Sequence, residues 1–348
     1  MAATNNPLEG ASSGCTVSQQ TLTIAGIHVT IHGLAEVPPT ADSVTCLWLL
    51  NPRLQTKETM APVAAQIISG WNATNPKKTG LIAAAFDQRN HGTRLVDKLH
   101  NEAWRQGNDT HAQDMFGCYH GTATDTSQLI DHLPSYIFRD PTSPRITAHM
   151  ALGISLGGHA TWHCLLADPR ITAGVVGIGC PDYTRLMTDR ARLSKRTTFT
   201  ATAPPGASFL GSCDFPPALQ RAVAQYDPAG LLTPGVFNPT GPDAPLTPVA
   251  LDRFARLARE RLRGKAILNL GGAADKLVPY AAGRPFLDTL KRVLRDDPSL
   301  DLRLEDVQFE GVGHAFPPAM VQTATAWICR LLTQREREQG GARRGSNM

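Results

Sequence analysis

The sequence predicts an α/β protein built on a mostly parallel sheet. Strand-length apolar runs alternate with stretches of helical spacing along most of the chain, which favours parallel strands joined by helical crossovers. Continuous apolar runs, such as those at 44–50 and 81–86, are typical of strands covered on both faces. The chain has 348 residues and is 42% apolar, which suffices for one large domain carrying an insertion. In such sheets the site lies beyond the carboxyl ends of the strands.

Residues 1–17 are expected to form a disordered leader, and β-branched residues around Gly26 predict a hairpin or two short antiparallel strands over 22–31. Apolar runs predict further strands at 44–50, 81–86, 148–153, 171–178, 266–270 and 304–309. Helical spacing predicts helices at 60–71, 126–137, 285–294 and 319–332. The charged, Gly-rich tail at 336–348 is expected to be disordered.

Two segments interrupt the alternation. Residues 93–122 are polar, irregular and dotted with aromatic side chains, and connections of this length are usually functional loops or lids. Residues 181–264 have a Pro/Gly/Thr-rich middle, flanked by helix-like pieces at 183–193, 217–225 and 248–262. Both segments begin after strands, on the face where a site is expected, so we expect them to cover it. The predicted apolar pocket wall consists of Trp104, Phe116, Phe209 and Leu210.

A nucleophile elbow is predicted at 153–158, Gly-Ile-Ser-Leu-Gly-Gly, between a strand and a helix. Gly153 and Gly157 remove Cβ atoms that would otherwise collide across the turn. The turn exposes the Ser155 hydroxyl as a candidate nucleophile. It also leaves the Leu156 amide free at a helix N-terminus, where a developing oxyanion would be stabilised.

A base and an acid are predicted at later strand ends. A serine hydroxyl is a weak nucleophile without a base, and His314 follows the last strand in a glycine-rich loop. Asp275 lies in a Gly-Gly-led turn after the strand at 266–270, where it would fix the imidazole tautomer. Asp182, after the strand at 171–178, is a competing acid. We interpret Asp182 instead as the N-cap of a following helix.

The quoted motifs resemble the α/β-hydrolase superfamily of serine hydrolases. The resemblance is carried by Gly-x-Ser-x-Gly-Gly at 153–158, Asp275 in GGAADKLVP and His314 in GVGHAF, in the order nucleophile, acid, histidine. Residues 87–92, DQRNHG, are similar to the superfamily's D-x-R-G-H-G loop, with Asn90 where glycine is common. The resemblance implies a central sheet of about eight strands flanked by helices. It also implies a core at 18–180 and 265–335, with a cap insertion after the sixth strand at 181–264.

The resemblance also implies a second oxyanion-hole amide in the loop after the strand at 44–50. Pro52 has no N–H, so Arg53 is the expected donor, with Leu54 as an alternative. In the DQRNHG loop, Asp87, Arg89 and His91 are interpreted as a structural turn because buried charges come paired.

The function that the resemblance implies is hydrolysis of a small-molecule ester, lactone or thioester. Ser155 would form an acyl-enzyme, with His314 as base and Asp275 as orienting acid. Two alternatives stay open: an acyltransferase with the same triad, and a catalytically silent small-molecule-binding protein on this fold. A silent protein would usually have lost one of the three residues, and none is lost here.

Other classes of function are disfavoured. The net charge of +4, without a basic stripe interleaved with aromatics, argues against nucleic acid as a partner. No apolar run reaches membrane-spanning length, and no signal peptide is visible. Seven cysteines without a CxxC pair indicate a cytoplasmic protein with reduced thiols. His159 and His163 have metal-site spacing but lack the intervening Glu and a third ligand, so no metal or cofactor is expected. The oligomeric state is not determined by the sequence.

Overall fold

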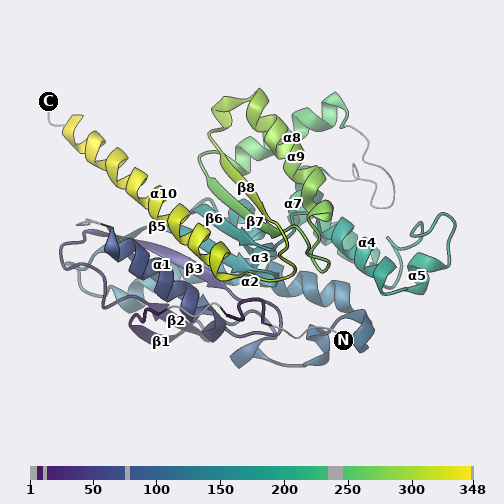
Figure 1. Cartoon of the computed structure of the whole chain (residues 1–348), viewed down its shortest axis with the longest axis horizontal. Coiled ribbons are helices and arrows are strands. Elements are labelled where there is room, and N and C mark those ends of the chain that lie inside the picture. The colour runs from purple at the N-terminus through teal and green to yellow at the C-terminus, as the bar shows by residue number, and fades with distance from the viewer. Residues whose placement is uncertain (1–5, 11–13, 75–78, 234–245, 346–348) are drawn as a thin grey trace.

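The computed structural model describes residues 6–10, 14–74, 79–233 and 246–345, with side chains to residue 338. These residues form one eight-stranded sheet in the order β1-β2-β4-β3-β5-β6-β7-β8 (Figure 1). The β1–β2 and β2–β4 pairs are antiparallel, and every other neighbouring pair is parallel. The predicted mostly parallel sheet and its antiparallel hairpin are therefore confirmed.

Each predicted strand is present, with ends shifted by a few residues. The strands are β1 (Gln19–Ile24), β2 (Ile27–His32), β3 (Ser43–Leu50), β4 (Thr79–Phe86), β5 (Arg145–Ile154), β6 (Ile171–Gly177), β7 (Ala266–Gly272) and β8 (Arg303–Phe309). Alternate side chains of the central strands point to opposite faces, and both faces are buried. On β3, Leu47 and Leu49 join one core, whereas Cys46, Trp48 and Leu50 join the other.

Helices cover both faces of the sheet. One layer contains α1 (Ala61–Ala73) and α10 (Pro318–Gly345), which pack on each other (Figure 1). The other contains α2 (His111–Ile137), α3 (Leu156–Ala167), α8 (Pro248–Leu262) and α9 (Tyr280–Asp296). Among the helices described, none is long and apolar enough to cross a membrane. All seven cysteines are free thiols.

The segment at 93–122 is more regular than expected. It begins with 3-10 turns at Gly92–Arg94, Leu99–Asn101 and Trp104–Gln106, and α2 then starts at His111. The prediction of an irregular segment to 122 was therefore wrong from 111 onward. The buried face of α2 includes Ala112, Met115, Phe116 and Tyr119, which do have helical spacing. Glycines and polar residues between them hid this signal.

Three other boundaries differ from the predictions. Helix α9 begins at Tyr280, so Pro285 lies inside the helix and not at its start. Helix α10 continues to Gly345, so residues 336–345 of the expected disordered tail are helical. Near the N-terminus, Leu8 is buried, and the Phe316 amide donates to the Pro7 carbonyl (2.7 Å). The rest of the expected leader includes 1–5 and 11–13, which lie outside the described residues.

The insertion after β6 forms short helices. They are α4 (Tyr183–Leu193), α5 (Thr197–Thr200), α6 (Pro217–Tyr226) and α7 (Pro228–Leu232), and residues 234–245 lie outside the described part. Helix α7 contacts α3, α4 and α8. Helix α8 packs on α3 and α9, so it belongs to the helical layer over the sheet. The part of the insertion that lies outside this helical layer is therefore shorter than the expected cap at 181–264.

Candidate active site

The turn between β5 and α3 holds Ser155 in a strained backbone conformation. Its φ is 56° and its ψ is −112°, a region that costs a residue with a side chain about 1–3 kcal/mol. Hydrogen bonds hold it there: the Ser155 amide donates to the Gly177 carbonyl (2.8 Å), and the His159 amide donates to the Ser155 carbonyl (3.1 Å). The predicted elbow is present in the structure.

The elbow glycines are required because backbone atoms lie against them. A Cβ at Gly153 would come within 1.9 Å of the Gly157 carbonyl oxygen. A Cβ at Gly157 would come within 2.0 Å of the Leu50 carbonyl oxygen on β3. Backbone cannot move aside as a flexible side chain can, so neither position accepts a larger residue without distortion.

The structure brings Ser155, His314 and Asp275 into one hydrogen-bonded chain. Ser155 Oγ lies 2.9 Å from His314 Nε2, and His314 Nδ1 lies 2.8 Å from Asp275 Oδ2. The other carboxylate oxygen of Asp275 accepts from the amides of Leu277 (2.8 Å) and Val278 (2.9 Å). With Nδ1–H donating to the carboxylate, Nε2 is free to accept the serine proton.

The competing acid has another task. Asp182 is the N-cap of α4, where its side chain accepts from the Arg185 amide (2.9 Å). Carboxylates at this position satisfy a helix amide that has no acceptor within the helix. The interpretation of Asp182 as a cap is therefore confirmed.

The two predicted oxyanion donors lie at the start of α3 and in the loop after β3. Leu156 is the first residue of α3, so its amide has no acceptor within the helix. Arg53 lies just beyond β3, in a loop shaped by Asn51, whose side chain donates to the carbonyls of Pro52 (3.1 Å) and Gln55 (2.8 Å). The Arg53 side chain donates from Nη1 to the Asn101 carbonyl (2.5 Å).

The loop at 87–92 is a structural turn. Asp87 is fully buried and accepts from the Lys57 amide (2.8 Å) and from the Thr93 amide (2.9 Å) and hydroxyl (2.8 Å). Arg89 pairs with Asp125 on α2, with Nη2 and Oδ1 2.9 Å apart. The buried charge is thus paired and hydrogen-bonded, as predicted.

A cavity of about 500 Å³ opens beside His314. Its walls come from the β3 loop, the 102–111 segment, the end of α4 and the acid loop: Arg53, Leu54, Glu102, Ala103, Trp104, Arg105, Gln106, His111, Arg190, Leu193, Ser194, Ala274, Lys276, Leu277 and His314. The volume fits a small-molecule ligand.

Only Trp104 of the four predicted wall residues lines this cavity. Phe116 is buried on α2 against Tyr119 and Tyr183 (ring centroids 5.3 and 5.2 Å apart). Phe209 is fully buried and supports Trp104 edge-on, with their ring centroids 6.2 Å apart. Leu210 lines a separate cavity near α6. The prediction failed for Phe116 and Phe209 because both rings pack into the hydrophobic core over one face of the sheet, and for Leu210 because it packs against the same core away from His314.

The charged wall residues other than Arg53 were not predicted from the sequence, and Arg53 was predicted only for its backbone amide. Four cations and one carboxylate line the cavity: Arg53, Arg105, Arg190, Lys276 and Glu102. One signal was available on α4. Its buried face includes Tyr183, Leu186 and Met187, and helical spacing places Arg190 on the same face. A cation on an otherwise apolar helix face indicates a special environment.

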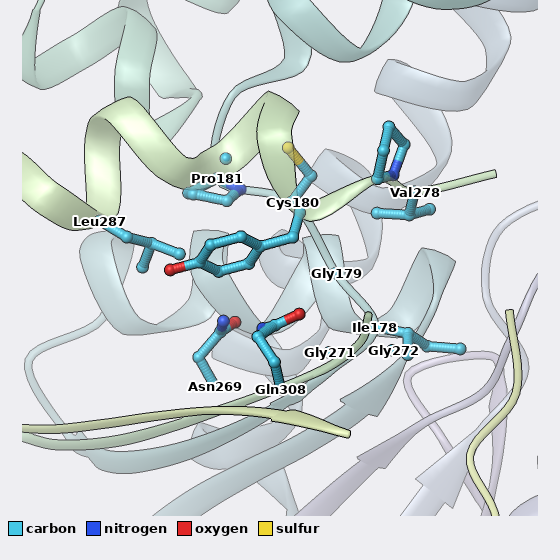
Figure 2. Close-up of a pocket in the computed structure, with 13 residues that line it drawn as sticks. Ile178, Gly179, Cys180, Pro181, Asn269, Gly271, Gly272, Val278, Leu287 and Gln308 are labelled. Carbon is cyan, nitrogen blue, oxygen red and sulfur yellow. The ribbon is translucent and has the colours of Figure 1, made fainter. Parts of the chain in front are cut away.

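A much smaller cavity lies behind the acid loop (Figure 2). Asn269 and Gln308 are neighbours there, and each has a buried side-chain oxygen without a hydrogen-bond partner among the described residues. The cavity measures about 20 Å³, which is room for a water molecule and not for a substrate.

The two histidines with metal-site spacing are buried in α3. The Cys180 amide donates to His159 Nδ1 (3.1 Å), and burial lowers the pKa of both His159 and His163 to about 3. Within the described part of the chain, no three His, Cys, Asp or Glu side chains are grouped so that they could hold a metal ion.

Solved structures share this architecture. A protein of Thermus thermophilus, TT1662, aligns with a TM-score of 0.52 at 17% identity, covering 90% of this chain and 96% of that one. The strand order and the elbow between β5 and α3 are those of one known fold. The chain has the α/β-hydrolase fold. A second structure with this fold, titled a "putative dipeptidyl aminopeptidase IV" from Bacteroides ovatus ATCC 8483, aligns with a TM-score of 0.50 at 12% identity, covering 92% of this chain and 36% of that one.

One curated protein is similar in sequence over a short stretch of this chain. No family model matches this α/β-hydrolase-fold chain. A curated protein of Bacillus subtilis (strain 168), named "Putative esterase YitV", is 36% identical over 76 residues. The match covers 22% of this chain and spans 29% of the length of that relative.

Proposed function

We propose that this protein is a serine hydrolase acting on a carboxylic ester, lactone or thioester of a small molecule. The single observation that carries the proposal is the hydrogen-bonded chain from Ser155 through His314 to Asp275, with the serine on a strained elbow. A conformation that costs free energy persists where surrounding structure enforces it, and such positions cluster at active sites.

In the proposed mechanism, Ser155 Oγ attacks the substrate carbonyl while His314 Nε2 accepts the hydroxyl proton. Asp275 keeps Nδ1 protonated and stabilises the imidazolium that forms. The amides of Leu156 and Arg53 donate to the oxyanion of the tetrahedral intermediate. His314 then returns the proton to the leaving group, and water activated by the same imidazole releases the acyl group.

An ester-type bond is proposed in preference to an amide because the curated relative is named an esterase, although its match is short. One solved structure with the fold is named an aminopeptidase, so amide substrates belong in the assay panel. An acyltransferase would form the same acyl-enzyme and pass it to an alcohol or amine. The intact triad argues against a silent binding protein.

Labelling with a fluorophosphonate tests the nucleophile. The wild type should form one covalent adduct, on Ser155, and should hydrolyse short p-nitrophenyl esters. Ser155→Ala should lose both properties and keep a native circular dichroism spectrum, because only the hydroxyl is removed.

Ser135→Ala, at an exposed position on α2, is the control and should label and turn over as the wild type does. An adduct on another serine, or full activity of Ser155→Ala, would overturn the proposal. Acyl transfer to an added alcohol in excess of hydrolysis would favour the acyltransferase.

A further inference from the structure

Two arginines in the cavity beside His314 lack a carboxylate partner. Arg53 comes from the loop after β3 and Arg190 from the last turn of α4, and both line the cavity. Within the described residues, no Asp or Glu oxygen lies within ion-pairing distance of either guanidinium. Most other buried or half-buried cations of the chain do have such a partner, for example Arg196 with Asp214 (2.7 Å).

Arg190 is held by weak, neutral contacts. Its Nη1 donates to the Met115 sulfur (2.9 Å) and to His111 Nε2 (3.4 Å), and its Nη2 donates to the Leu277 carbonyl (3.4 Å). Its Nε is buried with no hydrogen-bond partner among the described residues. A guanidinium has five N–H donors, so Arg190 keeps unused donor capacity beside the cavity.

His111, which lies against Arg190, does not neutralise its charge, and the Asp275 carboxylate acts on it without forming an ion pair. His111 Nδ1 donates to the Glu102 carbonyl (2.9 Å), and burial lowers the pKa of His111 well below its usual value, so the imidazole is neutral. Burial, together with the nearby charge of Arg53, lowers the pKa of Arg190 to about 10. Arg190 therefore remains a cation at neutral pH, in a setting that disfavours cations.

Arg53 is in a similar position. One Nη1–H donates to the Asn101 carbonyl, and burial lowers the pKa of its guanidinium. Glu102 is the carboxylate of the cavity wall, and its charge acts on Arg53 in the opposite direction without forming an ion pair. Two guanidiniums thus line one cavity, and the nearby carboxylates of Glu102 and Asp275 act on them without forming an ion pair.

We propose that Arg53 and Arg190 bind an anionic group of the substrate, a carboxylate or a phosphate, and so make this enzyme selective for anionic esters. The inference rests on the proposed hydrolase function and names the substrate class of that same site. Guanidiniums match both anions geometrically and bind them through charge-assisted hydrogen bonds. Binding would supply the counter-charge that the folded protein lacks.

The rim of the cavity is consistent with this role. Arg105 and Lys276 line it and are exposed, which adds positive potential at the entrance. Cations at a cavity mouth raise the local concentration of anionic ligands and speed their association.

Matched ester pairs test the proposal on either side of the scissile bond. The acyl-side pair is mono-4-nitrophenyl adipate and its methyl ester, and the alcohol-side pair is 3-(4-acetoxyphenyl)propionate and its methyl ester. We expect the wild type to prefer the anionic member of at least one pair by about tenfold or more in kcat/KM. Raising the salt concentration should reduce this preference. Repeating the better pair with a phosphonate in place of the carboxylate shows which anion is favoured.

Variants assign the preference to the two side chains. Arg190→Gln and Arg53→Gln should each lower the ratio of anionic to neutral kcat/KM by about tenfold, mainly through KM. Arg190→Lys should keep part of the ratio that Arg190→Gln loses, since lysine has the charge but not the planar, bidentate guanidinium. Arg192→Gln, at an exposed position on the same helix where Arg192 pairs with Asp189 (2.6 Å), is the control and should leave the ratio unchanged.

The outcomes separate this inference from the function on which it rests. A wild type that cleaves both members of both pairs equally would overturn the anion preference, while fluorophosphonate labelling of Ser155 would still support the hydrolase. A preference that survives in both glutamine variants would also overturn the assignment. Absence of both turnover and labelling would overturn the hydrolase itself.

Discussion

At the scale of single residues, neighbouring backbone atoms decide which glycines can be replaced by alanine. Gly157→Ala should destabilise the protein by at least about 3 kcal/mol, because the added Cβ would lie 2.0 Å from the Leu50 carbonyl oxygen. Gly117→Ala is the matched control, since nothing lies within 4 Å of its Cβ on the exposed side of α2. It should raise stability by about 0.5–1 kcal/mol, as expected when alanine replaces glycine in a helix. Urea unfolding of both variants checks this, and equal stability of the two would contradict it.

A second residue-scale prediction concerns a buried acid. Asp227 caps α7, accepts from the amides of Tyr183 and Gly230 (both 3.3 Å), and lies with its Oδ1 3.9 Å from His163 Nε2. Burial raises its pKa from 3.8 to about 8. The folded state therefore keeps a proton that the unfolded chain releases, so this acid makes stability fall as the pH rises from about 4 to about 8.

Asp227→Asn should remove that dependence, because the amide is neutral at every pH and its oxygen can still cap the helix. The stability of the variant relative to the wild type should rise by at least about 1 kcal/mol between pH 5 and pH 8. Chemical denaturation at several pH values measures this difference. A difference that is constant across the range would show that Asp227 is ionised in the fold.

At the scale of elements, two aspartates at neighbouring strand ends have separate tasks. Asp275→Asn should lower kcat by on the order of ten-thousand-fold, because the carboxylate that fixes the His314 tautomer is lost. Asp182→Asn should stay within about tenfold of the wild type, since asparagine is also a good N-cap for α4. Ester hydrolysis by the two purified variants tests the ranking, and the reverse order would place the acid after β6.

The scale of elements also shows where sequence reasoning worked. Strands β3, β4 and β6 are continuous apolar runs, and such runs are local signals that survive in any tertiary context. Helix α2 was recognised only from 126 onward because its first half carries polar residues that face other parts of the structure. Pro285 misled the placement of α9, since proline is more common in a first helical turn than in an interior.

At the scale of the whole molecule, the insertion after β6 and the core share side-chain contacts. Tyr183 on α4 packs on Phe116 of α2 (5.2 Å) and on Phe215 (6.1 Å), and its hydroxyl donates to the Ala112 carbonyl (2.6 Å). Helix α7 contacts α3, the helix that follows the elbow. We therefore expect insertion and core to unfold as one cooperative unit.

Calorimetry tests this expectation. The wild type should show a single unfolding transition. Phe215→Ala should lower the midpoint temperature of that whole transition, because the loss of a fully buried aromatic costs about 3–5 kcal/mol. Val249→Ala, at a position 78% exposed on α8, is the control and should change stability by less than about 0.5 kcal/mol. Two separate transitions, with Phe215→Ala affecting only one, would mean that the insertion folds independently.

The sequence alone determined the strand-helix alternation, the elbow and the three residues of the hydrogen-bonded chain. These follow from local features: apolar runs of strand length, glycines where a turn leaves no room for a Cβ, and polar residues directly after strands. Tertiary structure alone decided which side chains share the cavity beside His314. Arg53 and Arg190 belong to elements far apart in the chain, so their shared lack of a carboxylate depends on packing between those elements. Phe116 and Phe209 were misassigned for the same reason, since only packing decides whether an aromatic ring faces a cavity or a core.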